Sequence, residues 1–165
     1  MPWTAPATRA TGDLITAAIW NTDLKDNLNY LRDTEIAYAQ IVADVSVTAT
    51  SSATPNDVVS SGAVTYTGEK VLIEGYFAHL TRGTTNIYVD LWDDATRLAQ
   101  MSGNSYTATI NGVSVANRRT PSAASHTYKF RAYVDAGTGT VGAGPGDGTG
   151  SLLPPSFIRV SKVAA

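Results

Sequence analysis

The residues that could carry chemistry in this sequence are few and widely spaced. His79 and His126 are the two histidines, and neither belongs to an H-x-x-x-H pair, so a metal site would need carboxylates from distant parts of the sequence. Asp90, Asp93 and Asp94 cluster at the expected end of a strand and offer oxygen ligands for a cation such as calcium. Their spacing lacks the regular alternation of a calcium-binding loop, so a solvated turn is the favoured interpretation.

One stretch has the spacing of a nucleotide-binding loop. Residues 137–142 read GTGTVG, which fits G-x-G-x-x-G and follows a predicted strand. A dinucleotide site needs a helix next, whose N-terminus would hold the pyrophosphate. The next residues include Gly144, Pro145, Gly146, Gly148 and Gly150. No helix tolerates that composition, so we expect a glycine-rich loop over residues 137–150, and a loop of this length often lies against a partner or a symmetry axis.

No pattern of residues predicts a hydrolase. Serine does not occur in a G-x-S-x-G motif, and with serine and threonine so abundant no Ser-His-Asp order is distinctive. Arg118 and Arg119 form a basic pair that we expect in a surface or interface salt bridge. The sequence therefore predicts no catalytic residue, no cofactor and no metal ligand, and we expect that the protein is not an enzyme.

Composition limits the classes of partner. The chain has 165 residues, 43% of them apolar, which is enough for one domain with a core and an appendage. Its net charge is −2 and its basic residues are scattered, so we expect neither nucleic acid nor an anionic membrane as a partner. The absence of cysteine excludes disulfides and thiolate metal sites. The sequence has no signal-peptide pattern and no apolar run of roughly 18 residues, so we expect a soluble protein.

The elements that would position any site begin with an extended arm over residues 1–14. Pro2, Pro6 and Gly12 surround a single large apolar residue, Trp3, and such a segment cannot build its own core. We expect Trp3 to dock in a groove on this subunit or, preferably, on a neighbour. Trp3 and Pro6 are therefore the predicted anchoring residues.

Residues 15–38 are expected to form an amphipathic α-helix and a linker. Thr16 is the predicted N-cap, and Ile15 and Trp20 are placed to form a hydrophobic staple. The apolar stripe consists of Trp20, Leu24, Leu28 and Leu31. It needs a partner, which is either the protein's own sheet or identical helices of other subunits.

From residue 39 to residue 165 the pattern has the period of two residues that is typical of strands. Strands are expected at 45–50, 58–66, 71–80, 87–92, 98–101, 106–110, 113–115, 127–134 and 157–163. Asn111-Gly112 is the strongest hairpin signal. Between residues 87 and 92, Tyr88, Asp90 and Trp92 should face away from the core. Strands separated by turns predict an antiparallel jelly roll or β-sandwich, and the whole protein is expected to be mainly β.

Two parts of the sequence carry a resemblance to a known class of proteins. Trp3 to Pro6, Gly12-Asp13 and residues 15–31 resemble the N-terminal arm and helix of small structural proteins of tailed bacteriophages and their prophage relatives. Residues 120–132, the glycine-rich segment and residues 155–163 are similar to the knob domains of the same proteins, which resemble the trimeric jelly rolls of the C1q and tumour necrosis factor type. The two matches cover about half the chain.

The resemblance implies a bacteriophage virion structural protein, assembled in the host cytoplasm and located on the virion. It implies a homotrimeric knob, held to capsid or tail proteins by its arm and helix. A capsid decoration protein or head fibre is preferred over a tail fibre or baseplate tip, because no shaft repeats separate the helix from the knob.

The alternative from a different class is a carbohydrate-binding module for host adhesion. Tyr88, Trp92 and Tyr106, if exposed on a jelly roll, would stack on the rings of a host-surface glycan.

Overall fold

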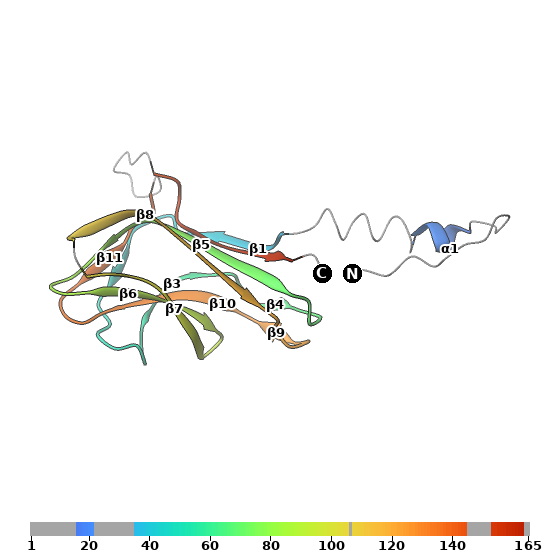
Figure 1. Ribbon diagram of the computed structural model, residues 1–165, viewed down its shortest axis with the longest axis horizontal. Helices are drawn as coiled ribbons and strands as arrows, with labels where there is room; N and C mark the ends of the chain where they lie inside the picture. The colour runs from blue at the N-terminus through green and yellow to red at the C-terminus, as the bar shows by residue number, and fades with distance from the viewer. Residues whose placement is uncertain (1–15, 22–34, 106, 145–152, 164–165) are drawn as a thin grey trace.

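The computed structural model describes residues 16–21, 35–105, 107–144 and 153–163 (Figure 1). Nearly all regular structure in these ranges is β, which confirms the predicted fold class. The strands are β1 (Glu35–Gln40), β2 (Val45–Val47), β3 (Asn56–Ser60), β4 (Val64–Thr65), β5 (Val71–Thr81), β6 (Ile87–Asp93), β7 (Thr96–Asn104), β8 (Thr109–Arg119), β9 (Ser125–His126), β10 (Tyr128–Val134), β11 (Gly139–Val141) and β12 (Phe157–Lys162).

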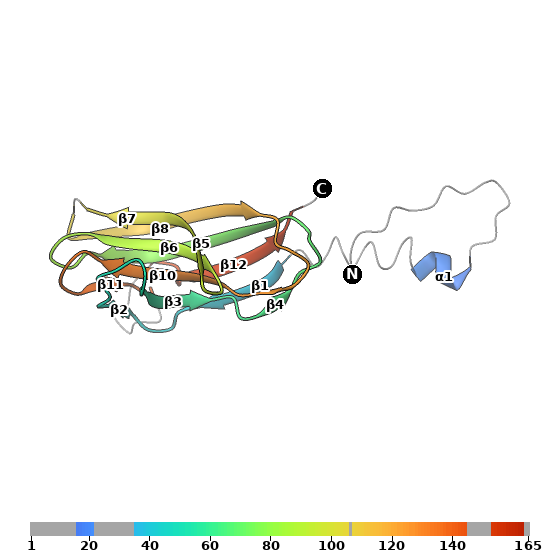
Figure 2. The same cartoon turned by 90° about the horizontal axis from the view of Figure 1, so that it is seen from below.

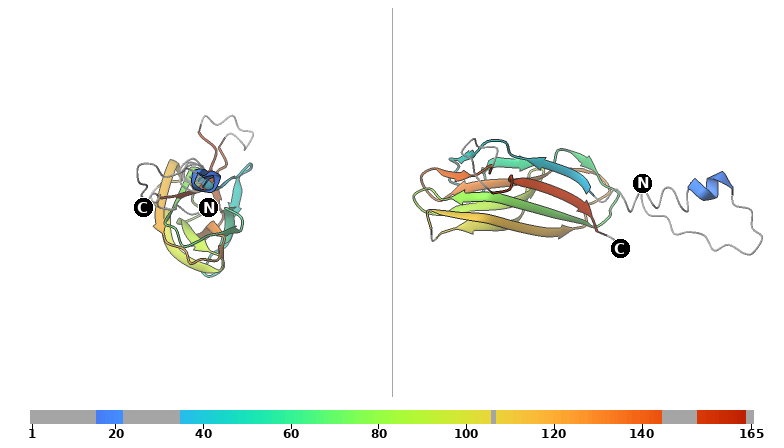
Figure 3. Two further views of the ribbon diagram at one scale, coloured as in Figure 1. Left: turned by 90° about the vertical axis from the view of Figure 1, so that its right-hand side faces the viewer. Right: turned by 90° about the horizontal axis from the view of Figure 1, so that it is seen from above.

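Two sheets form a sandwich, whose layers lie one above the other in Figure 1; Figure 2 shows it from below, and the left panel of Figure 3 shows it end-on. The six-stranded sheet has the order β1-β12-β5-β11-β2, with β8 on the other edge of β5. The four-stranded sheet has the order β3-β10-β6-β7, and β4 and β9 form a short ribbon. Every strand pair in the described residues is antiparallel. Several strands pair with strands that are distant in the sequence, such as β1 with β12 and β3 with β10, as is typical of a jelly roll.

The hydrophobic core lies between the two sheets because the strands alternate apolar and polar side chains. In β10, Tyr128, Phe130, Ala132 and Val134 are buried, and the residues between them are less so. Phe77 of β5 reaches across the sandwich to Phe130, with ring centroids 5.2 Å apart in an edge-to-face arrangement. Each fully buried phenylalanine contributes about 1.5–3 kcal/mol to folding.

The N-terminal helix is described over one short segment, α1 (Ala17–Ile19). The predicted N-cap is confirmed, since Thr16 Oγ1 accepts a hydrogen bond from the Ile19 amide at 3.3 Å. Trp20 follows α1 and is 56% exposed. The other residues predicted for anchoring or for the apolar stripe lie outside the described residues: Trp3, Pro6, Leu24, Leu28 and Leu31.

The sheet begins earlier than the predicted boundary at residue 39. β1 starts at Glu35, inside the range assigned to the helix and linker. Ile36 and Ala37 pack against the core, and β1 pairs with β12 along its length. Residues 35–40 form a strand because they pair with β12, which lies near the other end of the sequence.

The predicted hairpin at Asn111-Gly112 is wrong. β8 runs without interruption through these residues and pairs with β5 from Thr109 to Arg119. Gly112 has a φ of 65°, so the local preference for a left-handed conformation is real. The chain nevertheless continues as a strand because pairing along the whole of β5 outweighs one local turn signal.

The glycine-rich segment is also not the continuous loop that we expected. Gly139–Val141 forms β11, which pairs with both β2 and β5. A Cβ on Gly139 would lie 2.9 Å from the carbonyl oxygen of Thr81, and one on Gly142 would overlap the His79 ring. These two glycines therefore allow close packing of the backbone inside the six-stranded sheet.

Candidate functional sites

The outer face of the six-stranded sheet carries three neighbouring aromatic side chains. Phe157 of β12 pairs with Gln40 of β1 and with Tyr76 of β5, and Tyr38 lies two residues before Gln40 on the same face. The ring centroids are 5.6 Å apart for Tyr38 and Phe157 and 6.2 Å apart for Tyr76 and Phe157. Tyr38 is 46% exposed. We call Tyr38, Phe157 and Tyr76 the aromatic row.

An ion pair lies on the same face beside the aromatic row. Arg159 donates to Glu74 Oε2 from Nη2 at 2.8 Å and from Nε at 3.1 Å. The two charges cancel, so the pair adds no net charge to the face. Aromatic residues and arginine are enriched where protein surfaces meet, and unpaired charges are depleted at the centre of such surfaces.

A groove of about 360 Å³ borders the aromatic row. Its walls combine apolar and polar groups, chiefly Tyr76, Phe157, Pro154, Val115, Glu74 and Ser114. The aromatic row and its groove were not predicted from the sequence. The signal that could have found them is the alternation in residues 157–161, where Phe157 and Arg159 share the face opposite to the buried Ile158 and Val160.

The outer face of the four-stranded sheet is covered by charged pairs. The Asp90 side chain is fully buried, and Arg97 donates to its Oδ1 from Nη2 at 2.9 Å while Arg97 Nε lies 2.7 Å from its Oδ2. The hydrogen bonds to Asp90 raise the pKa of Arg97. Asp90 therefore belongs to this pair and does not join the aspartates that follow it.

Trp92 was predicted to be exposed, and that prediction is wrong. Its residual exposure is 6%, and the Arg131 guanidinium carbon lies 4.7 Å from its ring centroid. Arg131 in turn pairs with Asp57 of β3. Trp92 does face away from the core, as expected from the alternation in β6. A cation from the neighbouring strand β10 covers it, which the pattern within β6 does not reveal.

Tyr88 is half-buried and engaged with neighbouring residues. Its ring stacks on Tyr133 with centroids 4.9 Å apart, and its hydroxyl donates to Asp135 at 3.2 Å and accepts from Asn86 at 2.9 Å. Tyr106, the third predicted glycan-stacking residue, lies outside the described residues. The described part of the chain therefore does not bring Tyr88 and Trp92 together as an open aromatic platform.

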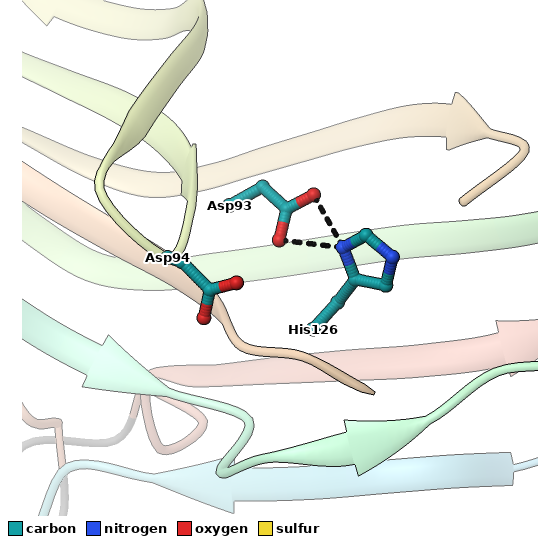
Figure 4. A group of neighbouring side chains, drawn as sticks. All are labelled: Asp93, Asp94 and His126. Carbon is teal, nitrogen blue, oxygen red and sulfur yellow. Dashed lines mark hydrogen bonds and ion pairs between the residues drawn. The ribbon is translucent and has the colours of Figure 1, made fainter. Parts of the chain in front are cut away.

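An aspartate-histidine cluster lies at one end of the four-stranded sheet (Figure 4). Asp93 ends β6, Asp94 follows it in the turn to β7, and His126 belongs to β9. His126 Nδ1 lies 2.8 Å from Asp93 Oδ2, and His126 Nε2 lies 3.0 Å from Ser122 Oγ. One potential ligand atom from each of Asp93, Asp94 and His126 lies within 4.8 Å of the other two.

Two buried tyrosines pack against this cluster. Tyr66 meets the ring of His126 edge to face at 5.8 Å, and Tyr128 stacks on the same ring at 6.3 Å. Burial, aided by the charge of Asp93, raises the pKa of Tyr128 to about 12. Burial is also the main cause that raises the pKa of Tyr66. The imidazole is thus held in a fixed orientation between aromatic rings.

Ser122, His126 and Asp93 are hydrogen-bonded in the order of a serine hydrolase triad. Acyl transfer also requires donors for the oxyanion and a cleft beside the serine. Neither the groove at the aromatic row nor the basic groove described next includes Ser122. The hydrogen bonds with Ser122 and Asp93 orient the imidazole of His126.

The predicted basic pair lines a second groove of about 280 Å³. Its other lining residues are Lys70, Thr120 and Val163. Arg119 Nη2 donates to the Leu98 carbonyl at 3.4 Å. Among the described residues neither Arg118 nor Arg119 forms the salt bridge that the sequence suggested.

Comparison with known proteins adds little to this geometry. No family model matches the sequence, and no curated protein matches it. The solved structures that are similar to this chain include the EclA C-terminal domain, described as a sugar-binding protein, with a TM-score of 0.38 and 8% identity over 67% of this chain and 76% of that chain. No helix in the described residues is long and apolar enough to cross a membrane.

Proposed function

We propose that this chain is a structural protein of a tailed bacteriophage virion, in which three copies of the jelly roll associate and residues 1–34 attach the knob to the particle. The observation that carries the proposal is the aromatic row on the outer face of the six-stranded sheet. The occupant of that face is a second copy of the chain. Capsid decoration or a head fibre is the preferred location, with a tail fibre or baseplate tip as the alternative.

The chemistry of the face supports self-association. Tyr38, Phe157 and Tyr76 offer apolar area, and the ion pair between Arg159 and Glu74 is already satisfied within one copy. Burial of such a face against an identical one adds apolar contact without leaving an unpaired charge. Self-association would also cover the exposed ring of Tyr38.

The direction of the chain supports attachment at one end. Glu35 at the start of β1 pairs with Ser161 near the end of β12, so the chain enters and leaves the sandwich at the same end (Figure 1). Copies arranged side by side around an axis would therefore all present residues 1–34 on one side. The predicted anchors, Trp3 and Pro6, and the apolar stripe belong to that part of the chain.

Light scattering of the full chain tests the association. We expect about three times the chain mass of 17.3 kDa. Tyr38→Ser and Phe157→Ser should reduce the mass to that of one chain. Tyr133→Ser is the matched control, because it removes an aromatic ring from the opposite outer face and should leave the trimer intact. A monomeric wild-type protein at micromolar concentration would contradict the proposal.

Attachment has its own test, because it concerns a different part of the chain. A variant without residues 1–14 should remain a β-rich trimer and fail to incorporate into purified particles. Trp3→Ala should weaken incorporation, since a buried aromatic anchor commonly contributes about 2 kcal/mol or more. Full occupancy of particles by the truncated protein would show that attachment runs through the sandwich. Imaging of labelled virions would separate capsid from tail.

A carbohydrate-binding module is the second candidate function. The groove of about 360 Å³ supports it, because aromatic Tyr76 and Phe157 lie there beside Glu74 and Ser114, which offer polar contacts for sugar hydroxyls. Self-association through this face would cover the groove, so the two functions compete. Glycan binding by a monomeric wild-type protein, lost in Tyr76→Ser, would favour the second candidate.

A further inference from the structure

We propose that Asp93, Asp94 and His126 form a binding site for a divalent transition-metal ion of the zinc class. The site lies where the turn after β6 meets β9 (Figure 4). The proposal does not depend on the virion function, because it concerns residues of the four-stranded sheet and of β9, not the aromatic row, and needs only one copy of the chain.

The geometry suits one small ion. The three ligand atoms lie within 4.8 Å of one another, and Nδ1 of His126 is 2.8 Å from Oδ2 of Asp93. Zinc binds nitrogen and oxygen ligands at about 2.0–2.2 Å, so ligand atoms around it are roughly 3–3.5 Å apart. Small side-chain movements would bring all three atoms to that spacing. Three protein ligands leave a fourth position for water.

The chemistry of the donors selects the class of ion. An imidazole nitrogen favours zinc and its neighbours, whereas magnesium and calcium prefer sites built of oxygen atoms alone. Two carboxylates supply charges that balance a dication. The side chains of Asp93 and His126 are 19% and 15% exposed, so both are largely buried but still accessible to solvent.

Ser122 provides the orienting contact that metal-bound imidazoles usually have. In the absence of an ion, Nδ1–H donates to Asp93 and Nε2 accepts from Ser122 Oγ at 3.0 Å. When an ion binds, the proton moves to Nε2, which then donates to Ser122, and the lone pair of Nδ1 faces the ion. One proton leaves Nδ1 and one joins Nε2, so the exchange is balanced.

The scaffold around the site is already ordered. The Asp94 amide donates to the Thr127 carbonyl at 2.9 Å, which ties the turn after β6 to the segment that carries His126. The Tyr66 ring packs on His126, the charge of Asp93 acts on its hydroxyl, and that hydroxyl is buried with no hydrogen-bond partner among the described residues. Native proteins seldom leave such a group unsatisfied. An ion with its bound water would offer an acceptor at this position.

Titration of the chelator-treated full chain with Zn²⁺, and with Co²⁺ for its visible spectrum, tests the site. We expect one ion per chain and a Co²⁺ spectrum of low coordination number. His126→Gln should abolish saturable binding. Asp94→Asn should weaken it at least tenfold without disturbing the turn, because Asn accepts the left-handed conformation that Asp94 adopts with a φ of 50°. Ser122→Ala should weaken it about tenfold.

The second histidine supplies a matched control. His79 Nε2 lies 3.8 Å from Asp44 Oδ2, but this pair is outside the three-residue cluster. His79→Gln should therefore leave Zn²⁺ affinity unchanged. No saturable binding by the wild-type chain, or full binding by folded Asp94→Asn and His126→Gln, would overturn the proposal. The mass from light scattering, measured on the same samples, reports on the trimer separately.

Discussion

The two outer faces of the sandwich differ in how far charged side chains cover the residues that point away from the core. On the four-stranded sheet, Asp90 is buried under Arg97, and Trp92 is covered by Arg131. On the six-stranded sheet, the aromatic row remains accessible and its neighbouring charges, Arg159 and Glu74, sit beside it and not over it.

One fold therefore combines a face covered by its own charged side chains with a face available for association. Long cationic side chains lie over the four-stranded sheet, and their guanidinium groups pair with Asp90 and Asp57. On the six-stranded sheet, no cation from the described residues lies over the Tyr38 ring, which leaves apolar surface for a partner. Substitutions on the two faces should therefore change different quantities, stability on one and association on the other.

The largest effect on stability is expected for Arg97→Met. This substitution leaves the fully buried Asp90 carboxylate without its cation. Removal of one partner of a buried ion pair costs about 3–5 kcal/mol, and partial exposure of Arg97 places the expected loss nearer 3 kcal/mol. Urea denaturation followed by circular dichroism measures it. A change below about 1 kcal/mol would mean that water satisfies Asp90.

Alkaline pH should be the next largest perturbation of the four-stranded sheet. Burial raises the pKa of Tyr128 to about 12, above the value of about 10 expected in the unfolded chain. Between these two pH values the folded state keeps a proton that the unfolded state loses. The contribution of Tyr128 to the free energy of unfolding is therefore complete below pH 10 and falls between pH 10 and 12. We expect a loss of about 2 kcal/mol at pH 12. Tyr128→Phe should reduce this slope, and the slope that remains belongs to the other tyrosines whose pKa is raised by burial, Tyr66 and Tyr133.

Arg131→Met should cost about 1 kcal/mol. It removes the cation above Trp92 and one partner of Asp57, which is itself largely exposed. The methionine chain still covers part of the indole, which limits the loss. Thermal unfolding measures the effect. Arg131→Ala, which uncovers the ring, should lose more, and equal losses in the two variants would show that cover of the indole contributes nothing.

The smallest effect on folding is expected on the six-stranded sheet. Arg159→Met breaks the pair with Glu74, and both side chains are partly exposed. Such pairs contribute about 0–1 kcal/mol. Unfolding of the dilute chain should therefore change little, in contrast to Arg97→Met. If Arg159→Met lowered the free energy of unfolding as much as Arg97→Met, the proposed difference between the two faces would be wrong.

Much of the fold can be read from alternation along the sequence. Residues 128–134 and 157–162 show which side chains face the core, and the structure agrees. Thr16 was recognised as a helix cap because capping depends on residues within one turn. Local patterns gave a wrong prediction where a strand distant in sequence determines the conformation. At Asn111-Gly112 a hairpin was predicted, but pairing with β5 keeps β8 continuous.

Periodicity and composition are local properties, so the sequence is enough to predict a mainly β chain with one core and an N-terminal segment of different composition. The contacts between side chains depend on the tertiary structure. His126 reaches Asp93 from 33 residues away, Arg131 covers Trp92 from a neighbouring strand, and Tyr38 meets Phe157 because the first strand pairs with the last. Each contact depends on strand order and register, which long-range pairing and core packing select together.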